Sequence, residues 1–423
     1  MRVPAVWLAL ALALSAFSAN PEIPRSEYKA RREALAKALP GSVTVMFGRS
    51  ERDTDDLRTG FFQEPNFFYL TGWMEPGAVM LLEPRADASP REILFLPERN
   101  PVRERWTGQK TGPGDDNAKT ATGFDTVLPV EKLESELKAS LERCRNLYTV
   151  GDSATASLKA LAPLRPVESA ATAIARLRMH KSPREIEMLQ RSADATVAAH
   201  RAAWKGAAPG MYEYQVAALM TGVYFDRGCE RSAYAPIVGS GANATILHYS
   251  RNSRRMDRGD LLLMDVAAEC GGYASDVTRT IPVGAGFSAR QREIYEIVLG
   301  AQKAVIAAVK PGMTISRNVP GSLYRVAFDY FNTHGKDLHG EPLAKYFIHG
   351  VSHHVGLDVH DAWDPEVPLE EGMVITVEPG LYIPEEGIGV RIEDTVLVTR
   401  DGARVMTSAL PREAEEIEKA IGK

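Results

Sequence analysis

The sequence predicts two domains: an N-terminal α/β domain over residues 25–175, and an α+β domain over residues 176–423 with an internal pseudo-twofold duplication. Helical and short apolar strand patterns alternate up to residue 175, a strong helix start follows at Ser182, and the elements beyond it recur in the same order. With 423 residues, of which 44% are hydrophobic and 25% charged, the chain has enough material for two hydrophobic cores.

Residues 1–19 precede this fold and have the pattern of a secretory signal peptide. Arg2 stands before an apolar run over residues 6–14, and small residues follow up to Ala19. The run is short for a membrane span, no cysteine follows it directly, and no later stretch of about 18 uncharged apolar residues occurs. We therefore expect cleavage, export to the periplasm or the medium, and no membrane association afterwards. The alternative is a buried N-terminal helix.

The N-terminal domain begins with a helical pattern over residues 28–39 and contains a predicted loop, rich in Gly, Asp and Thr, over residues 107–123. Four apolar runs predict strands at Val43–Phe47, Phe67–Leu70, Ala78–Leu82 and Ile93–Leu96. This mixture of helix and strand patterns indicates an α/β domain.

The second domain is predicted to start at a helix N-terminus. Ser182 is a candidate cap, with Pro183 at the first helical position and Glu185 completing a capping box. Apolar or small residues then recur on one helical face, at Ile186, Leu189, Ala193 and Val197. The domain boundary is therefore expected between Ala175 and Lys181.

The same order of elements occurs twice in this domain. A second capping box begins at Ser288 with Gln291, and a Pro-Gly-Met tripeptide follows each long helix, at residues 209–211 and 311–313. Each copy continues with another helical stretch and a strand hairpin, the first of which covers residues 261–283. Two copies are too few for a solenoid, so we expect two half-domains related by a pseudo-twofold axis.

The first hairpin carries two aspartates, Asp265 and Asp276. Its two-residue loop is either Cys270-Gly271 or Gly271-Gly272, and with either loop both aspartates fall on the same sheet face. Two like charges on one apolar face need a positive charge between them, and a divalent cation is the simplest candidate. The alternative is an edge strand from which both side chains point to solvent.

The second copy repeats this arrangement. A strand pattern over residues 373–377 ends at Glu378, and the return strand over residues 389–398 contains Glu393. Two such hairpins facing each other across the axis would bring four carboxylates together. A nitrogen ligand for the same site is expected from the histidines.

Four of the nine histidines lie between residues 349 and 360. They are His349, His353, His354 and His360. A lone histidine is more often structural, but this density, flanked by glycines, favours a functional cluster. His248 lies apart from them, shortly after a Gly-Ser-Gly loop.

The composition excludes several other classes of protein. A net charge of -5 with scattered basic residues provides no basic stripe for nucleic acid, so peptides or small molecules are the expected partners. Cys144, Cys229 and Cys270 are far apart and lack a C-x-x-C spacing, so they predict neither a thiolate metal site nor a disulfide framework. Export would permit one disulfide, whose partners the sequence does not specify.

On these motifs the chain resembles aminopeptidase P, the proline-specific branch of the pita-bread metallopeptidases. The resemblance runs from Arg25 to Lys423 and includes the Phe-Phe-Tyr-Leu-Thr-Gly segment at residues 67–72, the helix entry at residues 177–189, and the hairpin and histidine motifs. It implies a pita-bread fold for the second domain and hydrolysis of the Xaa-Pro bond at the N-terminus of peptides. The substrates would be peptides with proline at the second position.

The resemblance also implies a ligand set for two divalent metal ions. The ligands would be Asp265, Asp276, His353, Glu378 and Glu393, of which Asp276 and Glu393 would bridge the ions. Four carboxylates and one imidazole suit a fairly hard ion, which favours Mn²⁺, with Fe²⁺, Co²⁺ or Zn²⁺ as alternatives. A hydroxide between the two ions would attack the scissile carbonyl.

Further roles follow from the same resemblance. Glu378 would shuttle a proton to the leaving proline nitrogen, and His248 and His360 would contact the substrate and stabilise the oxyanion. His354 departs from the family pattern, which often has a bulky aromatic or apolar residue there. The remaining substrate-binding positions would be His349, Arg391 and Tyr382.

Relatives of the same fold leave alternatives open. A prolidase shares all the ligands but cleaves only dipeptides, whereas a methionine aminopeptidase usually lacks a large N-terminal domain. Binding modules and metal-independent amidinohydrolases of this fold have lost ligand residues that this chain keeps. The resemblance also implies a dimer or tetramer in which the N-terminal domain mediates contacts and borders a neighbour's active site.

Overall fold

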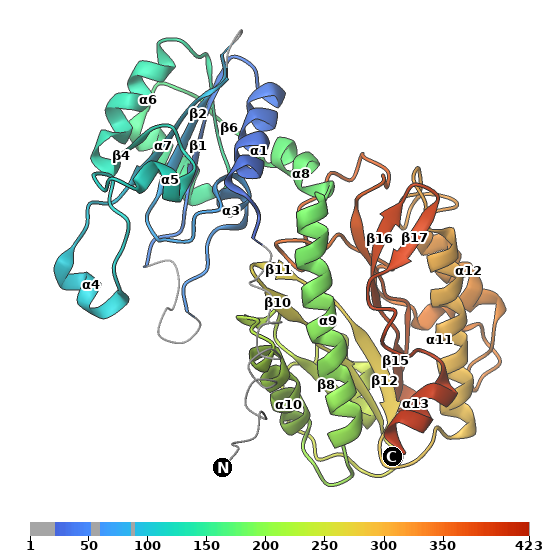
Figure 1. Cartoon of the computed structure of the whole chain (residues 1–423). Coiled ribbons are helices and arrows are strands. Elements are labelled where there is room, and N and C mark those ends of the chain that lie inside the picture. The colour runs from blue at the N-terminus through green and yellow to red at the C-terminus, as the bar shows by residue number, and fades with distance from the viewer. Residues whose placement is uncertain (1–21, 52–59, 86–88, 423) are drawn as a thin grey trace, which may run out of the picture.

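The computed structural model describes residues 22–51, 60–85 and 89–422, which form two domains connected by α8 (Ala171–Met179) and α9 (Pro183–Gly206) (Figure 1). The predicted signal peptide, residues 1–19, lies outside the described residues, so its cleavage stays a prediction. Within the described ranges, no helix is both long and apolar enough to cross a bilayer.

A six-stranded mixed sheet organises the N-terminal domain, in the order β4-β3-β2-β1-β5-β6. Its strands are β1 (Ser42–Phe47), β2 (Val79–Glu83), β3 (Arg91–Leu96), β4 (Val127–Pro129), β5 (Asn146–Thr149) and β6 (Val167–Ser169). The helices of this domain are α1 (Arg25–Ala38), α3 (Pro65–Thr71), α4 (Pro101–Thr107), α5 (Ala118–Thr122), α6 (Leu133–Leu141) and α7 (Asp152–Leu161). The α/β class is confirmed, although the predicted loop over residues 107–123 contains the short helix α5.

One predicted strand of this domain is wrong. Residues 67–70 lie in α3, which has Pro65 at its first turn and ends before Gly72, a glycine in the left-handed conformation with φ 60°. The Glu64 carboxylate accepts a hydrogen bond from the Phe67 amide at 2.6 Å and so caps the helix. Proline at the start and glycine after the end are helix-boundary signals, and here they outweigh the strand preference of a short apolar run.

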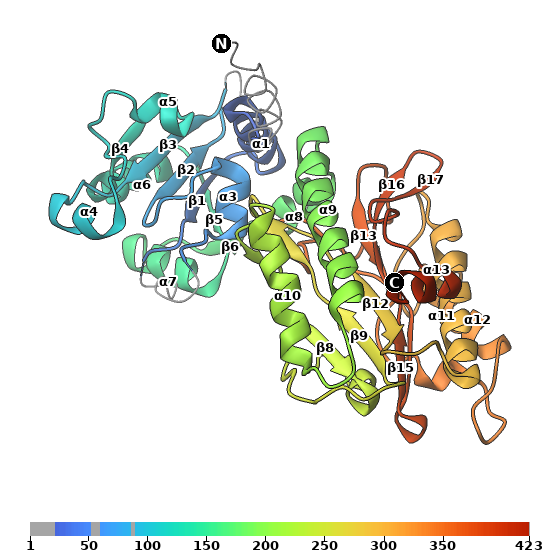
Figure 2. The ribbon, with the colours of Figure 1, turned by 60° about the horizontal axis from the view of Figure 1, so that its bottom comes forward.

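The second domain places two helix pairs on opposite sides of several short sheets (Figures 1 and 2). Besides α9, its helices are α10 (Glu213–Asp226), α11 (Ala289–Ala308), α12 (Leu323–Thr333) and α13 (Ala414–Ile421). The strands of the first half are β7 (Arg231–Ser232), β8 (Ile237–Ser240), β9 (Leu261–Asp265), β10 (Ala268–Cys270), β11 (Tyr273–Ala274) and β12 (Thr278–Pro282). Those of the second half are β13 (Val374–Val377), β14 (Gly380–Ile383), β15 (Ile388–Arg391), β16 (Asp394–Thr399) and β17 (Gly402–Val405).

The internal duplication is visible in the order of these elements. Each half has a long capped helix, a shorter helix and an antiparallel strand pair: α9, α10 and β9-β12 in the first half, and α11, α12 and β13-β16 in the second. Both predicted capping boxes form, Ser182 with Glu185 and Ser288 with Gln291. α9 packs against α10, and α11 packs against α12. The strands that carry the acidic residues therefore lie between two equivalent helix pairs.

The first hairpin turns at Gly271-Gly272, the second of the two loops that the sequence allows. Cys270 pairs with Tyr273 across this loop. Both glycines have positive φ values, 61° and 81°, which a type I′ turn requires of its two central residues. This loop places Asp265 opposite Thr278 in the β9-β12 pair.

All four acidic residues of the two hairpins lie where a strand is interrupted. Asp265 ends β9 and Asp276 lies between β11 and β12, while Glu378 follows β13 directly and Glu393 lies between β15 and β16. The predicted continuous return strands are therefore each broken into two. A break in strand pairing frees a side chain from the strict alternation of the sheet, so the acids of both halves can turn towards one space.

Candidate metal centre and active site

A buried cluster of acids and one histidine lies where the two half-domains meet. The ligand atoms of Asp276, His353 and Glu393 all lie within 4.8 Å of one another. The His353 Nε2 atom is 3.3 Å from Asp276 Oδ2 and 3.6 Å from Glu378 Oε1. The structure thus brings one acid of the first hairpin and both acids of the second around the same imidazole.

Tyr234 joins Asp265 to this cluster. The tyrosine hydroxyl oxygen lies 2.5 Å from Asp265 Oδ1 and 2.6 Å from Asp276 Oδ1. One hydroxyl has one proton, so it cannot donate to both carboxylates at the same time. Asp265 also accepts from Arg391, and Asp276 lies beside His353, but the buried acids of the cluster outnumber these cationic groups, and a bound cation would offset the excess.

The ring of His353 is oriented by its neighbours. Its Nδ1 atom lies 3.0 Å from the carbonyl oxygen of His354, which can only accept, so Nδ1 carries the proton and donates. In the neutral form of the ring, Nε2, which faces the acids, is then the atom with a free lone pair. Fixing one ring nitrogen on a carbonyl in this way is how metal-binding histidines are usually held.

The three predicted substrate-binding residues form a connected chain beside the acids. Arg391 donates through Nη2 to Asp265 Oδ2 and through Nη1 to the Tyr382 hydroxyl, both at 2.6 Å. The Tyr382 hydroxyl in turn lies 2.9 Å from His349 Nε2. These side chains therefore build one wall next to the acid cluster.

Two of the acids resist ionisation. Burial, reinforced by the charge of Asp265, raises the pKa of Asp276 to about 6, although a hydrogen bond with His353 opposes the rise. Burial and the neighbouring carboxylates also raise the pKa of Glu393 well above its usual range. The cluster therefore has more negative groups than positive ones, and a divalent cation would stabilise their ionised forms.

Glu378 behaves in the opposite way. Burial disfavours its charge, but the hydrogen bond and charge of His349 outweigh this and lower the pKa of Glu378 to about 2. For His353, burial disfavours the charged ring, but the hydrogen bond with Asp276 and the charges of the neighbouring acids outweigh this and raise its pKa to about 9. A metal ligand must be deprotonated, so a proton and a metal ion compete for Nε2 of His353. The residues of this site fit a metal ion by charge, burial and donor type.

His360 and His248 lie beside this cluster and are exposed. The ring centroid of His360 is 4.3 Å from that of His353, with the rings edge to face. Partial burial and the charge of His353 lower the pKa of His360, and the charge of His248 contributes in the same direction. Leu247 and Tyr249, which flank His248, pack against the hydrophobic cluster that includes Tyr382. Both side chains are accessible to a substrate that approaches the buried acids.

His354 has a different environment from its neighbours. Its side chain is buried, and its ring stacks on Trp363 with the centroids 5.6 Å apart. Its backbone forms an isolated bridge with Ile375 of β13. The residue therefore belongs to the packing behind the cluster, and its carbonyl orients His353.

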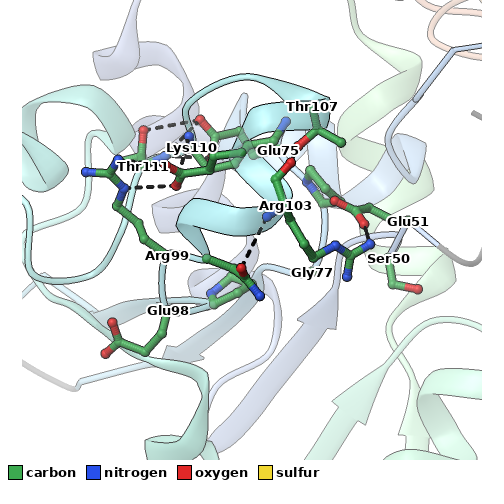
Figure 3. A pocket seen from close by; sticks show the side chains of 14 residues that line it. Ser50, Glu51, Glu75, Gly77, Glu98, Arg99, Arg103, Thr107, Lys110 and Thr111 are labelled. Carbon is green, nitrogen blue, oxygen red and sulfur yellow. Dashed lines mark hydrogen bonds and ion pairs between the residues drawn. The ribbon is translucent and has the colours of Figure 1, made fainter.

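A separate cavity of about 440 Å³ lies in the N-terminal domain beside α4 (Figure 3). Several of its polar groups contact one another: Arg99 donates to Glu104 at 2.7 Å, and the Thr111 amide donates to Glu75 at 3.0 Å. Among the described residues, its lining includes neither histidine nor cysteine. The residues predicted for catalysis and metal binding are not among those that line this cavity.

Comparison with known proteins agrees with the geometry of the acid cluster. Residues 187–400 match metallopeptidase family M24, and residues 28–148 match the aminopeptidase P N-terminal domain. The chain belongs to the M24 metallopeptidase family. A metallopeptidase of this family is expected to bind a metal ion that takes part in hydrolysis. The second domain has a buried group of acids and a histidine that could bind such an ion.

Several M24 relatives cover both domains. The Xaa-Pro aminopeptidase of Haemophilus influenzae is 35% identical over 95% of this chain and 98% of its own length. Proline aminopeptidase P II from Yersinia pestis has a solved structure with a TM-score of 0.84, 32% identity, and coverage of 95% of this chain and 100% of that chain. Zinc-substituted Escherichia coli aminopeptidase P in complex with product has a TM-score of 0.83 and 33% identity, covering 95% of this chain and 99% of that one. The predicted family and the pita-bread fold are confirmed.

Two features near the M24 site were missing from the sequence-based expectations. Tyr234 follows β7 in an Ala-Tyr-Ala-Pro stretch that has no diagnostic spacing, and only the packing of β7 beside β10 brings it to the aspartates. Cys229 and Cys270, which are 41 residues apart in sequence, form a disulfide, while Cys144 is buried and free. The pairing of the cysteines depends on the same strand contact.

Proposed function

We propose that this M24 metallopeptidase is an Xaa-Pro aminopeptidase, which removes the N-terminal residue that precedes a proline. The buried cluster of Asp276, His353 and Glu393 carries the proposal, because such a donor set can hold a hydrolytic metal. The Xaa-Pro aminopeptidase that matches 95% of this chain supports the substrate class. The alternative of a prolidase, limited to dipeptides, is not favoured by these relatives.

The proposed cofactor is a pair of divalent metal ions, with Mn²⁺ favoured over Fe²⁺, Co²⁺ and Zn²⁺ by the excess of oxygen donors. When bound, such ions activate water and polarise the scissile carbonyl. By the family resemblance, Asp276 and Glu393 would serve both ions, and burial raises the pKa of both acids, so a bound cation would favour their ionised forms. The proposed ligands are Asp265, Asp276, His353, Glu378 and Glu393.

The other groups bind the substrate and move protons. The Glu378 carboxylate, which is ionised at neutral pH, accepts a proton from the attacking water and passes it to the proline nitrogen. The exposed imidazoles of His248 and His360 contact the substrate and stabilise the oxyanion. The wall of His349, Tyr382 and Arg391 receives the proline ring. Proline is suited to a shaped pocket because its ring is rigid and its nitrogen has no N–H to satisfy.

The proposal is tested by hydrolysis of matched peptides, Xaa-Pro, Xaa-Pro-Yaa and Xaa-Ala-Yaa, with Mn²⁺ and with a chelator. We expect cleavage of Xaa-Pro-Yaa before proline, loss of this activity on chelation, and little cleavage of the alanine peptide. Cleavage of the dipeptide alone would identify a prolidase instead. Failure to cleave any of the three with metal bound would refute the substrate class and favour a binding role for the fold.

We also propose that the protein is exported, with residues 1–19 removed. The Cys229–Cys270 disulfide supports this, since disulfides form and persist in oxidising compartments such as the periplasm or the medium. Mass spectrometry of the mature protein tests the proposal. A mature chain that starts after about residue 19 is expected by the signal-peptide pattern, and an intact Met1 would contradict it.

A homo-oligomer is proposed on the basis of α4. This short helix exposes Trp106 to 89% and Val102 to 67%, at the edge of the N-terminal domain (Figures 1 and 2). Aromatic residues are enriched at protein interfaces relative to the rest of the surface. A second copy of the chain is the partner that the family resemblance favours.

A further inference from the structure

Glu213, which is not part of the acid cluster, holds the segment that carries His248. Glu213 is the first residue of α10, and its side chain is fully buried. Its Oε1 atom accepts hydrogen bonds from the Ser240 amide at 2.7 Å and the Ser240 hydroxyl at 2.8 Å. Its Oε2 atom accepts from the Tyr249 hydroxyl at 2.9 Å and from the Arg254 amide at 2.8 Å. One carboxylate therefore ties together both ends of the segment.

The segment held in this way, residues 240–254, packs against the active-site wall. Its helical turn η2 (Gly241–Thr245) places Ala244 in one hydrophobic cluster with Tyr382. The contact with β15 is so close that a Cβ atom at Gly389 would lie 1.9 Å from the Ala244 carbonyl oxygen. α10 lies beside β8, from which the segment continues. The 240–254 segment is thus fixed on one side by Glu213 and on the other by β15.

His248 has little local support of its own. Its side chain is exposed, and it is the residue directly before Tyr249, whose hydroxyl is bound to Glu213. A nearby side-chain amide, that of Asn243, also donates to the Glu213 carboxylate, at 3.1 Å. The position of the imidazole therefore depends on the backbone of the segment, and the backbone depends on Glu213.

We propose that Glu213 is a positioning residue for the peptidase reaction, which holds His248 in its catalytic position by fixing the 240–254 segment. This inference rests on the proposed function, because the contact of His248 with the substrate is part of that proposal. Glu213 does not act on the substrate itself. The hydrogen bonds of its carboxylate within the described residues go to this segment.

A carboxylate is required at this position, and an amide of the same shape does not replace it. Glu213 accepts hydrogen bonds at both oxygens, whereas a glutamine side chain has one acceptor oxygen and one NH₂ donor. In Glu213→Gln the NH₂ group faces either the Ser240 amide or the Arg254 amide, both of which can only donate. The displaced end of the segment then moves, and His248 moves with it. A displacement of about 1 Å at a catalytic group can lower a rate by about 10²-fold.

The test is a double-mutant cycle on kcat/KM for Xaa-Pro-Yaa with the metal-loaded full-length protein and its Glu213→Gln, His248→Ala and doubly substituted variants. We expect Glu213→Gln to lower kcat/KM by at least about tenfold, and to cost less than about twofold once His248 is alanine. An equal loss in both backgrounds overturns the inference, because it shows that Glu213 acts independently of His248. A His248→Ala variant with unchanged kcat/KM overturns both this inference and the role proposed for His248.

Hydrogen exchange of the 240–254 segment gives a readout that does not depend on the substrate. Exchange in this segment should rise in Glu213→Gln, and unchanged exchange there overturns the inference even if no Xaa-Pro peptide is cleaved. The matched control is Glu83→Gln, which changes another buried carboxylate, bound by Ser140 at 2.7 Å and by Arg143 at 2.7 Å, in the N-terminal domain. This control should keep kcat/KM within about twofold of the wild type, so that a larger loss in Glu213→Gln is not a general effect of such an exchange.

Discussion

Individual side chains around the acid cluster are oriented by specific hydrogen-bond partners, and substitution of these partners has predictable effects. The Tyr234 hydroxyl contacts both aspartates of the first hairpin, Asp265 at the end of β9 and Asp276 just before β12. His353 is oriented by a backbone carbonyl, and Glu378 is kept ionised by His349. Each of these contacts fixes a donor atom before any ion or substrate arrives, which lowers the reorganisation needed for binding.

Removing the Tyr234 hydroxyl should weaken metal binding without unfolding the protein. In Tyr234→Phe the two aspartates lose the hydrogen bond that orients them, and loss of such a contact typically lowers metal affinity by about 10- to 100-fold. Titration of the metal-free protein with Mn²⁺ measures the effect. Tyr224→Phe is the matched control, because the Tyr224 hydroxyl is buried and has no hydrogen-bond partner among the described residues. Equal affinities of the two variants would contradict the role given to Tyr234.

His200 should make the stability of the second domain depend on pH. It is fully buried in α9 and donates through Nε2 to the Val277 carbonyl at 3.2 Å, and burial lowers its pKa to about 3. In the unfolded chain the pKa returns to about 6.5, so below pH 6.5 the unfolded state takes up a proton that the folded state does not. This contribution to stability is complete above pH 6.5 and is lost as the pH falls towards 3.

The expected size of this effect is about 1.4 kcal/mol per pH unit, or about 2 kcal/mol between pH 6.5 and pH 5. Denaturant unfolding of the wild type and of His200→Gln at both pH values measures it, since glutamine can keep the hydrogen bond but cannot titrate. The exposed His334→Gln exchange controls for the change of residue type. Parallel pH profiles for the wild type and His200→Gln would show that the burial of His200 has no such cost.

At the scale of elements, the small sheet of β7, β10 and β11 supports the first hairpin. β7 leads to Tyr234 and β11 leads to Asp276, and both strands pair with β10. The disulfide between Cys229, just before β7, and Cys270, at the end of β10, joins these strands covalently. The same pairing that positions the acid cluster is therefore reinforced by a bond between segments 41 residues apart.

The disulfide should contribute measurably to the stability of this domain. A crosslink of this loop length restricts the unfolded chain, and its removal typically costs about 2–4 kcal/mol. We expect the double exchange Cys229→Ala with Cys270→Ala to lower the free energy of unfolding by that amount under non-reducing conditions. Cys144→Ala, which removes a buried but unbridged cysteine, is the control. Addition of a reductant should bring the wild type close to the double variant, and a wild type indifferent to reductant would argue against the bridge.

At the scale of the whole molecule, buried ion pairs connect the domain junction to the histidine segment. Lys181 lies between α8 and α9, and its ammonium group is 2.8 Å from Asp361 Oδ2, with both side chains about 1% exposed. Arg178, in α8, is also paired with Asp361 and donates to Asn66 of the N-terminal domain at 2.7 Å. A hydrophobic cluster with residues from both domains adds to this contact, including Leu70 and Val355. The N-terminal domain therefore packs against the segment that carries His353.

We expect the protein to self-associate through α4. Replacing the exposed Trp106 with glutamate should move the protein towards monomer, because a charge replaces the apolar group that a partner would cover. Analytical ultracentrifugation of the wild type and Trp106→Glu over a range of concentrations measures this. Leu164→Glu, an equally exposed apolar residue at 94% on another part of the domain, is the control. A wild type that sediments as a monomer would refute the proposed oligomer.

Features that depend on a few neighbouring residues could be predicted from the sequence alone. The capping boxes at Ser182 and Ser288 predicted the starts of the long helices, because a capping box is a contact between residues three positions apart. The glycine pair at residues 271–272 predicted the hairpin, because a type I′ turn needs positive φ values at its two central residues. The internal duplication and the family could also be predicted from the sequence, because the motifs that identify them are short. At residues 67–70, by contrast, the helix signals on both flanks were outweighed in the prediction by an apolar run that fits a strand equally well.

Which distant residues meet depends on the packing of whole elements. The choice of Gly271-Gly272 over the alternative loop, the breaks that free Asp276 and Glu393 from their strands, and the pairing of Cys229 with Cys270 all follow from strand register. Tyr234 reaches the aspartates and Glu213 reaches both ends of the 240–254 segment only after the sheets and helices have packed. Local sequence patterns encode conformations over a few residues, whereas these contacts join residues that are about 27 to 42 positions apart and depend on how whole elements pack together.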